Sequence, residues 1–205
     1  MIITITPSAM VSAGSNASIC ETANNYTLVG SSISNYSAIL WTTNGTGTFS
    51  NPAILHPVYT PSAADISAGN VTLTLTTNDP AGPCPFASDA MMVIIFPAAT
   101  VNAGPDQSIC ALASATLAGS IGGSAVSASW TGGTGTYAPN ANTLNAVYTP
   151  SAAERTAETV TLILTTNNPA GPCNPVSDDM TIAIGSSPTG AVITGSGDVC
   201  VGGSS

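Results

Sequence analysis

An internal repeat constrains the fold of this chain more than any other feature of its sequence. Three blocks occur twice in the same order, at a spacing of 90 residues for the first cysteine and 89 for the later blocks: Val11–Cys20 and Val101–Cys110, Pro57–Ala64 and Ala146–Ala153, Val71–Cys84 and Val160–Cys173. A fixed period of this kind is the signature of an array of small domains. We therefore expect two whole repeats, 9–97 and 98–186, with the closing strand of a preceding repeat in 1–8 and the start of a further one in 187–205.

Within each repeat the apolar residues follow the period of β-strands. Val71, Leu73 and Leu75 alternate with threonines, which gives one apolar and one hydroxylated face. Other short apolar segments are separated by Gly, Pro, Asn and Ser, and no window keeps a helical period. Seven or so short strands in about 89 residues predict an all-β fold, an antiparallel immunoglobulin-like sandwich in each repeat.

A short helical turn is expected before one strand of each repeat. Ser62 is followed three residues later by Asp65, and Ser151 by Glu154. This is the spacing of a capping box, in which the hydroxyl and the carboxylate satisfy free N–H groups at the start of a helix. The box accounts for these two acids without a ligand.

The charge balance excludes several classes of partner. The chain has ten acids and one base, Arg155, for a net charge of −9. Nucleic acids and anionic membrane surfaces are bound by clustered Lys and Arg, so neither is an expected partner. No run of apolar residues is long enough for a membrane helix. The N-terminus lacks the basic and apolar regions of a signal peptide, so we expect the targeting signals elsewhere in a longer polypeptide.

Each full repeat carries two cysteines, 64 residues apart in the first repeat and 63 in the second, and these four cysteines allow three pairings. Because each repeat has one cysteine of each kind, the sequence favours Cys20 with Cys84 and Cys110 with Cys173. Disulfides predict an extracellular protein. Zinc is the rival interpretation, but no second pair of Cys or His completes a zinc set.

The repeat also resembles a known family. The segments that carry the resemblance are Ala103–Cys110, Ser129–Tyr137, Tyr148–Glu154, Val160–Thr166 and Gly171–Cys173. Together they are similar to the PKD-like, immunoglobulin-like repeats of very large Bacteroidota surface proteins, most of all those of gliding-motility adhesins exported by the type IX secretion system. The resemblance spans nearly the whole chain. It implies a location at the bacterial cell surface and a role in reaching or gripping a substratum, and it implies no catalytic residues.

Most aromatic side chains are explained as core residues. Trp41 and Trp130 occupy equivalent strand positions, so we expect them to anchor the two cores. Four aromatics have no counterpart in the other repeat and are the better candidates for contact with a sugar: Tyr26, Tyr36, Phe86 and Phe96.

Calcium is the one cofactor that the acids suggest, and only as a secondary interpretation. Asp79, Asp89, Asp106, Asp178, Asp179 and Asp198 fall in loops or beside turns, and among them only Asp89 and Asp178 recur as acids in both repeats. Calcium needs six to eight converging oxygens, and the chain has no D-x-D-x-D-G loop. We expect solvated loop acids, with Asp89 and Asp178 as the candidates for a site at a junction.

Nothing in the sequence points to catalysis. His56 is the single histidine, and Asn145 replaces it in the second repeat, so no catalytic triad is expected. Gly132–Gly135 lacks the helix and the lysine of a phosphate loop. The chain is not expected to be an enzyme.

The preferred interpretation is the repeat region of a secreted adhesin filament that acts as a rigid spacer. Neighbouring repeats of the same chain are the expected partners, with surface polysaccharide or substratum beyond them. The short connectors around Pro97 and Pro188 hold proline, which restricts the angle between neighbours. The alternatives are a stalk or surface-layer component, a spacer or carbohydrate-binding module of a secreted hydrolase, and polymerisation through the stray first strand.

Overall fold

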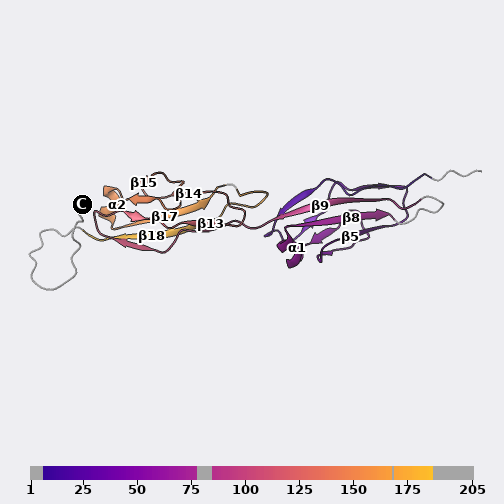
Figure 1. Cartoon of the computed structure of the whole chain (residues 1–205), viewed down its shortest axis with the longest axis horizontal. Coiled ribbons are helices and arrows are strands. Elements are labelled where there is room, and N and C mark those ends of the chain that lie inside the picture. Colours follow the sequence, from indigo (N-terminus) through magenta and orange to yellow (C-terminus); the bar gives the residue numbers. More distant parts are fainter. Residues whose placement is uncertain (1–6, 78–84, 168, 187–205) are drawn as a thin grey trace, which may run out of the picture. The chain divides into compact units, whose positions relative to one another are not determined.

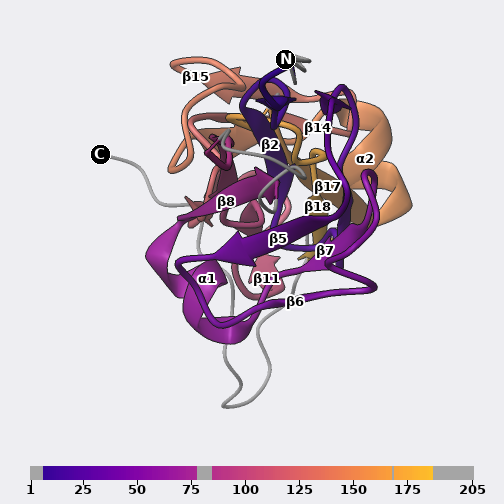
Figure 2. The ribbon, with the colours of Figure 1, turned by 90° about the vertical axis from the view of Figure 1, so that its right-hand side faces the viewer.

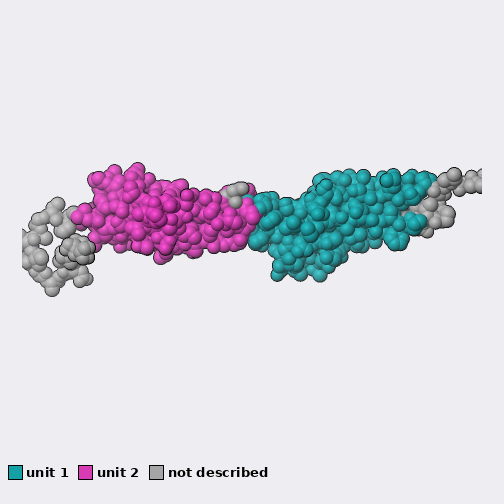
Figure 3. All heavy atoms as spheres, turned by 45° about the horizontal axis from the view of Figure 1, so that its top comes forward, with its two compact units in different colours: residues 1–98, 171–173 teal, residues 99–170, 174–205 magenta. Residues whose placement is uncertain are grey.

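The computed structural model describes residues 7–77, 85–167 and 169–186. The chain forms two compact units, coloured separately in Figure 3. The first unit contains Met1–Ala98 together with Gly171–Cys173, and the second contains Ala99–Ala170 and Asn174–Ser205. Three residues of the second repeat's sequence are thus part of the first unit.

The first unit is a β-sandwich. Its largest sheet has the strand order β2-β9-β8-β5, and a second sheet has the order β3-β7-β6. Figure 1 shows β9, β8 and β5 side by side. The first edge is split, because β1 pairs with β4 in a separate two-stranded sheet while β2 runs parallel to β9 in the largest sheet. The elements are β1 Met10–Ser12, β2 Ala17–Cys20, β3 Tyr26–Thr27, β4 Ser32–Ser34, β5 Ile39–Thr43, β6 Thr48–Phe49, β7 Val58–Thr60, α1 Ala63–Ala68, β8 Asn70–Thr77 and β9 Ser88–Phe96.

The second unit repeats this topology. Its sheets have the orders β11-β18-β17-β14 and β12-β16-β15, with a split first edge in which β10 pairs with β13. The all-β prediction is confirmed. The elements are β10 Thr100–Asn102, β11 Gln107–Ile109, β12 Ala115–Thr116, β13 Ser120–Gly122, β14 Ala128–Thr131, β15 Thr136–Ala138, β16 Val147–Thr149, α2 Ala152–Ala157, β17 Thr159–Thr166 and β18 Ser177–Ile184.

Each unit has its own apolar core, supplied by the inward faces of alternating strands. Val71, Leu73 and Leu75 of β8 are buried, whereas the threonines between them are half-exposed. Trp41 and Trp130 are buried core residues, as expected, and each indole N–H is satisfied: the Nε1 of Trp41 donates to the Leu55 carbonyl, and that of Trp130 to the Leu144 carbonyl. A buried tryptophan with its donor paired is a fixed packing element rather than a ligand platform.

The expected helical turns are present in both units. Ser62 and Ser151 each accept the N–H of the acid three residues on, and each acid accepts the N–H of its serine, which completes the capping box. Figure 2 shows α1 next to β8. Gly69 caps the C-terminus of the first helix and Glu158 that of the second, both in the left-handed backbone region.

Several predicted features lie outside the described residues. These are most of the closing strand expected in 1–8, the expected start of a further repeat in 187–205, the calcium candidates Asp79 and Asp198, and Cys84.

Candidate functional site: the disulfide and the buried acid of each repeat

The disulfide of the first unit corrects the predicted pairing. Cys20 is bonded to Cys173, with an S–S distance of 2.02 Å, a Cα–Cα distance of 4.9 Å and a sequence separation of 153 residues. The predicted pairs Cys20–Cys84 and Cys110–Cys173 are therefore wrong, because the sulfur atoms of Cys20 and Cys173 are joined to each other. Cys110 is also disulfide-bonded, to neither of these two residues.

Strand direction explains why the pairing within one repeat fails. Cys20 ends β2, and its partner in the parallel ladder is Phe96, the last residue of β9. The connection that leads from β8 to β9 leaves and re-enters the sheet near Thr76 and Ser88, at the other end of β9. Nine residues of β9 separate the two ends, roughly 25 Å at about 3.3 Å per step. A disulfide needs Cα atoms closer than about 7 Å.

The same directions hold in the second unit. Ile109, just before Cys110, lies beside Ile184 at the end of β18. The β17–β18 connection, which contains Cys173, meets the sheet where Thr165 pairs with Ser177, at the opposite end. In the second repeat Cys110 and Cys173 therefore belong to opposite ends of one sheet. Counting cysteines per repeat could not reveal this, whereas assigning a direction to each strand could have.

The loop that carries Cys173 is shaped for its place in the first unit. Gly171 has φ +73°, and a Cβ built on it would lie 2.3 Å from the Phe96 ring. Both the backbone conformation and the close approach therefore require glycine. The sulfur of Cys173 lies 3.4 Å from the Pro97 carbonyl oxygen. Cys20 and Cys173 are 7% and 5% exposed, so the bond is largely shielded from solvent.

A buried acid organises one corner of the first unit. Asp65, 3% exposed, accepts hydrogen bonds from the Tyr59 hydroxyl at 2.8 Å and from the backbone N–H groups of Thr46, Gly47 and Ser62 at 3.0, 2.9 and 2.9 Å. The carboxylate thus connects the β5–β6 turn, β7 and the start of α1.

The second unit builds the same corner with a longer acid. Glu154 accepts from the Tyr148 hydroxyl at 2.8 Å, from the N–H of Ser151 at 2.7 Å and from the N–H of Thr134. The next N–H along the turn, that of Gly135, donates to the Tyr148 hydroxyl instead of the carboxylate. Sequence analysis found the capping role of these acids but missed their tyrosine partners.

Burial and hydrogen bonding compete in setting the pKa of each acid. Burial by itself raises the pKa of Asp65, but donors from Ser62, Tyr59 and Thr46 outweigh it, so the pKa lies below its usual range. For Glu154, burial is likewise outweighed by donors from Thr134, Ser151 and Tyr148, and the pKa is lowered. Burial, reinforced by Glu154, raises the pKa of Tyr148, and the same causes raise that of Tyr137 to about 12. The acids are therefore charged and the tyrosines neutral at physiological pH, which is the state that the hydrogen bonds require.

The two calcium candidates have backbone partners instead. The Oδ2 of Asp89 accepts the Ala13 N–H at 2.8 Å, and the Oδ2 of Asp178 accepts the Ala103 N–H at 2.8 Å. These matched bonds fasten the first strand of each repeat to its last. The described residues contain no cluster of three His, Cys, Asp or Glu side chains that could hold a metal ion. The structure therefore gives Asp89 and Asp178 a structural role.

The unmatched aromatics are spread over the surface of the first unit and are not gathered into a platform. Tyr36 and Phe86 are 48% and 63% exposed, and Phe96 packs against Gly171. Tyr26 is half-buried and lines a hollow with six neighbours: Ser12, Gly14, Ser15, Asn16, Val29 and Gly30. Asn16 is engaged there, because its Oδ1 accepts the Met92 N–H.

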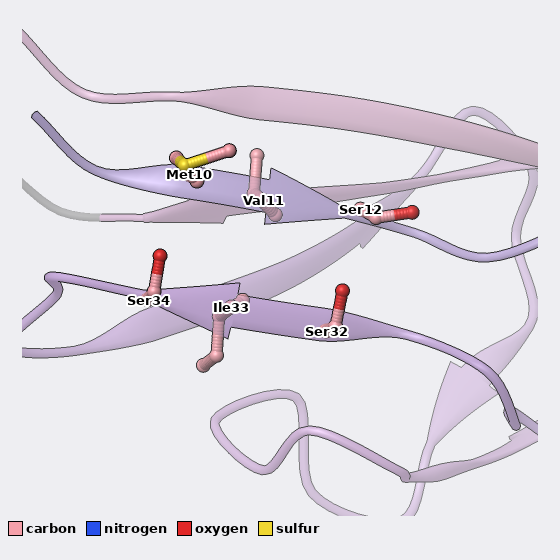
Figure 4. A pocket seen from close by; sticks show the side chains of 6 residues that line it. All are labelled: Met10, Val11, Ser12, Ser32, Ile33 and Ser34. Atoms are coloured by element: carbon pink, nitrogen blue, oxygen red, sulfur yellow. The ribbon is translucent and has the colours of Figure 1, made fainter.

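A second hollow lies along the paired strands β1 and β4 (Figure 4). Its lining consists of three serine hydroxyls and three apolar side chains: Met10, Val11, Ser12, Ser32, Ile33 and Ser34. These residues include no carboxylate, imidazole or thiol, so the hollow has no group for acid–base or nucleophilic chemistry. In the part of the chain that the structure describes, no helix is long and apolar enough to cross a membrane.

Comparison with known proteins supports the fold and gives no sequence family. No family model matches the chain, and no curated protein matches it. Immunoglobulin domains 1–5 of Sidekick-1 align with a TM-score of 0.54 at 14% identity, covering 88% of this chain and 40% of that one. Domains 1–4 of Sidekick-1 align at 0.52 and 14% identity, covering 88% and 50%. The human CDH23 EC21–23 fragment aligns at 0.50 and 13% identity, covering 89% and 66%.

The chain spans between 40% and 66% of the length of these three structures. Their identity to it is too low to show more than the fold. The chain is thus built of two similar all-β sandwich domains of the immunoglobulin-like and cadherin-like type.

Proposed function

We propose that this chain is part of the repeat region of a secreted bacterial cell-surface adhesin, in which the repeats form an extended spacer. The observation that carries the proposal is the Cys20–Cys173 disulfide between cysteines of successive repeats. Residues Gly171–Cys173 of the second repeat belong to the first unit. A covalent bond of this kind links successive repeats of an array.

The physical chemistry of the chain supports an extracellular location. Disulfides persist in oxidising compartments and are rare in reducing ones. Fold similarity to the immunoglobulin and cadherin fragments agrees with a repeat array of adhesion type. The resemblance of segments such as Ser129–Tyr137 to repeats of Bacteroidota surface proteins supports a bacterial origin and export by the type IX secretion system.

A spacer role also fits the absence of an equipped site in the described residues. Asp65, Glu154, Asp89 and Asp178 all have structural hydrogen bonds, and the hollow between β1 and β4 has no reactive group. In this role the repeats hold a binding element at a distance and perform no catalysis.

Small-angle scattering on this chain and on a tandem duplicate of it, with twice the number of repeats, tests the spacer. The radius of gyration should grow in proportion to the number of repeats if the array is an extended fibre. Growth near the square root of that number would contradict it, because a chain of freely jointed beads scales in that way.

Antibodies against the chain should label intact cells that express the parent gene, and labelling only after lysis would contradict the surface location.

A further inference from the structure

The Cys20–Cys173 bond encloses most of both apolar cores. The core of the first unit has two of its buried residues, Ala13 and Ile19, on the N-terminal side of Cys20. That of the second has Met180, Ile182 and Ile184 on the C-terminal side of Cys173. All other buried residues of these two packed clusters lie between the two cysteines in sequence.

This connectivity decides which part of the chain carries tension. A pulling force follows the shortest covalent path between the points of attachment. At the disulfide that path crosses 4.9 Å between Cα atoms and omits the segment between them. Unfolding of a sandwich lengthens a protein only by releasing chain that lies on the path, and here most of each sandwich core lies off it.

We propose that the Cys20–Cys173 disulfide is a mechanical clamp that carries tensile load past both β-sandwiches. Under tension β1 and β2 can peel away from one end and β18 from the other, because these strands lie outside the enclosed segment. Strands β3 to β17 are bypassed. The inference concerns tension within this chain and does not depend on the surface to which a parent protein would attach.

The surroundings of the bond suit a permanent clamp. Both cysteines are buried, and thiol–disulfide exchange requires access of an attacking thiolate to a sulfur atom. Gly171 allows the loop to pass against the Phe96 ring, which keeps Cys173 beside the end of β9. A second fastening holds β1 and β2 in the first unit, since Asp89 accepts the Ala13 N–H.

Single-molecule pulling on the whole chain, attached through peptide tags at its two ends, tests the clamp. Outside the bridge lie 19 residues before Cys20 and 32 after Cys173. The oxidised chain should therefore extend to no more than about 180 Å before a covalent bond breaks, at about 3.3–3.6 Å per residue. Dithiothreitol supplies the two electrons and two protons that leave a thiol at each cysteine, itself closing to a cyclic disulfide. The reduced chain should extend by about 500 Å more.

Two variants separate this bridge from the other disulfide. Cys110→Ser removes the bond at Cys110 and should leave the oxidised chain as short as the wild type. Cys20→Ser/Cys173→Ser should show a new unfolding step without reductant, on the order of 300 Å for a domain of about 90 residues. An oxidised wild-type chain that shows such a step would overturn the proposal. The comparison of oxidised and reduced wild type keeps the test decisive if the double variant does not fold.

Discussion

The two repeats share their long sequence blocks but build the corner around the helix with different residues. In the first unit Asp65 is short enough for its oxygens to accept the N–H groups of both Thr46 and Gly47. In the second, Glu154 takes only the first of the two equivalent N–H groups, and the Tyr148 hydroxyl takes the other. The comparison teaches that the requirement is a complete set of acceptors for buried donors rather than one particular acid.

The two repeats contribute different cysteines to the Cys20–Cys173 disulfide. The first repeat supplies the cysteine at the end of β2, and the second supplies the cysteine of the β17–β18 connection. Cys173→Ser should lower the free energy of unfolding by about 2–5 kcal/mol, measured as a shift of the urea transition. Non-reducing peptide mapping of the wild type should recover Cys20 linked to Cys173. Recovery of Cys20 linked to Cys84 would restore equivalence between the repeats and remove the clamp.

Removing either buried acid should have the next largest effect. Asp65→Ala leaves the Tyr59 hydroxyl and three backbone N–H groups without their acceptor. Glu154→Ala likewise removes the acceptor of the Tyr148 hydroxyl and of two backbone N–H groups. Since an unpaired buried donor costs about 1–3 kcal/mol, we expect each variant to lose about 3 kcal/mol, measured by thermal and urea unfolding. Asp65→Glu, which copies the second repeat, should lose less than Asp65→Ala. Equal losses would show that the acceptors do not matter.

The same acids predict how stability depends on pH. A pKa that is lower in the folded state means that the unfolded chain binds protons more readily as the pH falls. The contribution of Asp65 and Glu154 is therefore complete at neutral pH and is lost as the pH falls below their ordinary values of 3.8 and 4.5 and through the lowered ones. The melting temperature should decline in that range, with a shallower decline in Asp65→Asn and Glu154→Gln. An unchanged slope in both variants would contradict the assignment.

The ends of the two helices offer a smaller, reciprocal test. Gly69 has φ +74°, and Glu158 has φ +58° at the equivalent position. Because a side chain in the left-handed region costs about 1 kcal/mol or slightly more, Glu158→Gly should stabilise the second unit by up to about 1 kcal/mol. Gly69→Ala should destabilise the first unit by about the same amount, because alanine disfavours the left-handed conformation. No steric clash adds to this cost, because the structure has space for a Cβ at Gly69. Differential scanning calorimetry measures the change in stability of each variant. If both variants were stabilised or both destabilised, the two helix ends would not be equivalent.

The smallest expected effect concerns the aromatic side chain beside each buried tyrosine. Phe49 packs against Tyr59 with ring centroids 5.0 Å apart, and Tyr137 against Tyr148 at 4.8 Å. Tyr137 adds a hydroxyl that donates to the Gly132 carbonyl at 3.0 Å near the surface. Tyr137→Phe should therefore cost about 0.5 kcal/mol, measured by urea unfolding, and a loss several times larger would assign the hydroxyl a role that the first repeat lacks.

Features that depend on local patterns could be predicted from the sequence. The alternation in Val71–Leu75 predicted a strand with one buried face, and the Ser62–Asp65 and Ser151–Glu154 spacings predicted the capped helices. Trp41 and Trp130 were identified as core residues because they recur. Each of these features is decided within a few residues or by comparison of the repeats.

The features that were missed depend on how distant segments meet. The disulfide pairing depends on the parallel course of β2 beside β9, which places Cys20 at the far end of the sheet from the pair Thr76 and Ser88. The roles of Asp89 and Asp178 depend on backbone N–H groups about 75 residues away in sequence. No spacing rule connects such partners, so the acids resembled loop residues that a metal could use.

The bond between cysteines of successive repeats has a consequence for how an array of such repeats can change in length. In sequence, each of the two whole repeats has one cysteine at the position of Cys20 and one at the position of Cys173. Recombination that duplicates or deletes a complete repeat therefore places a cysteine of the second kind after one of the first, and the junction can close again. An array that gains or loses complete repeats would therefore keep one cysteine of each kind at every junction, whereas gain or loss of part of a repeat would leave a thiol without its partner.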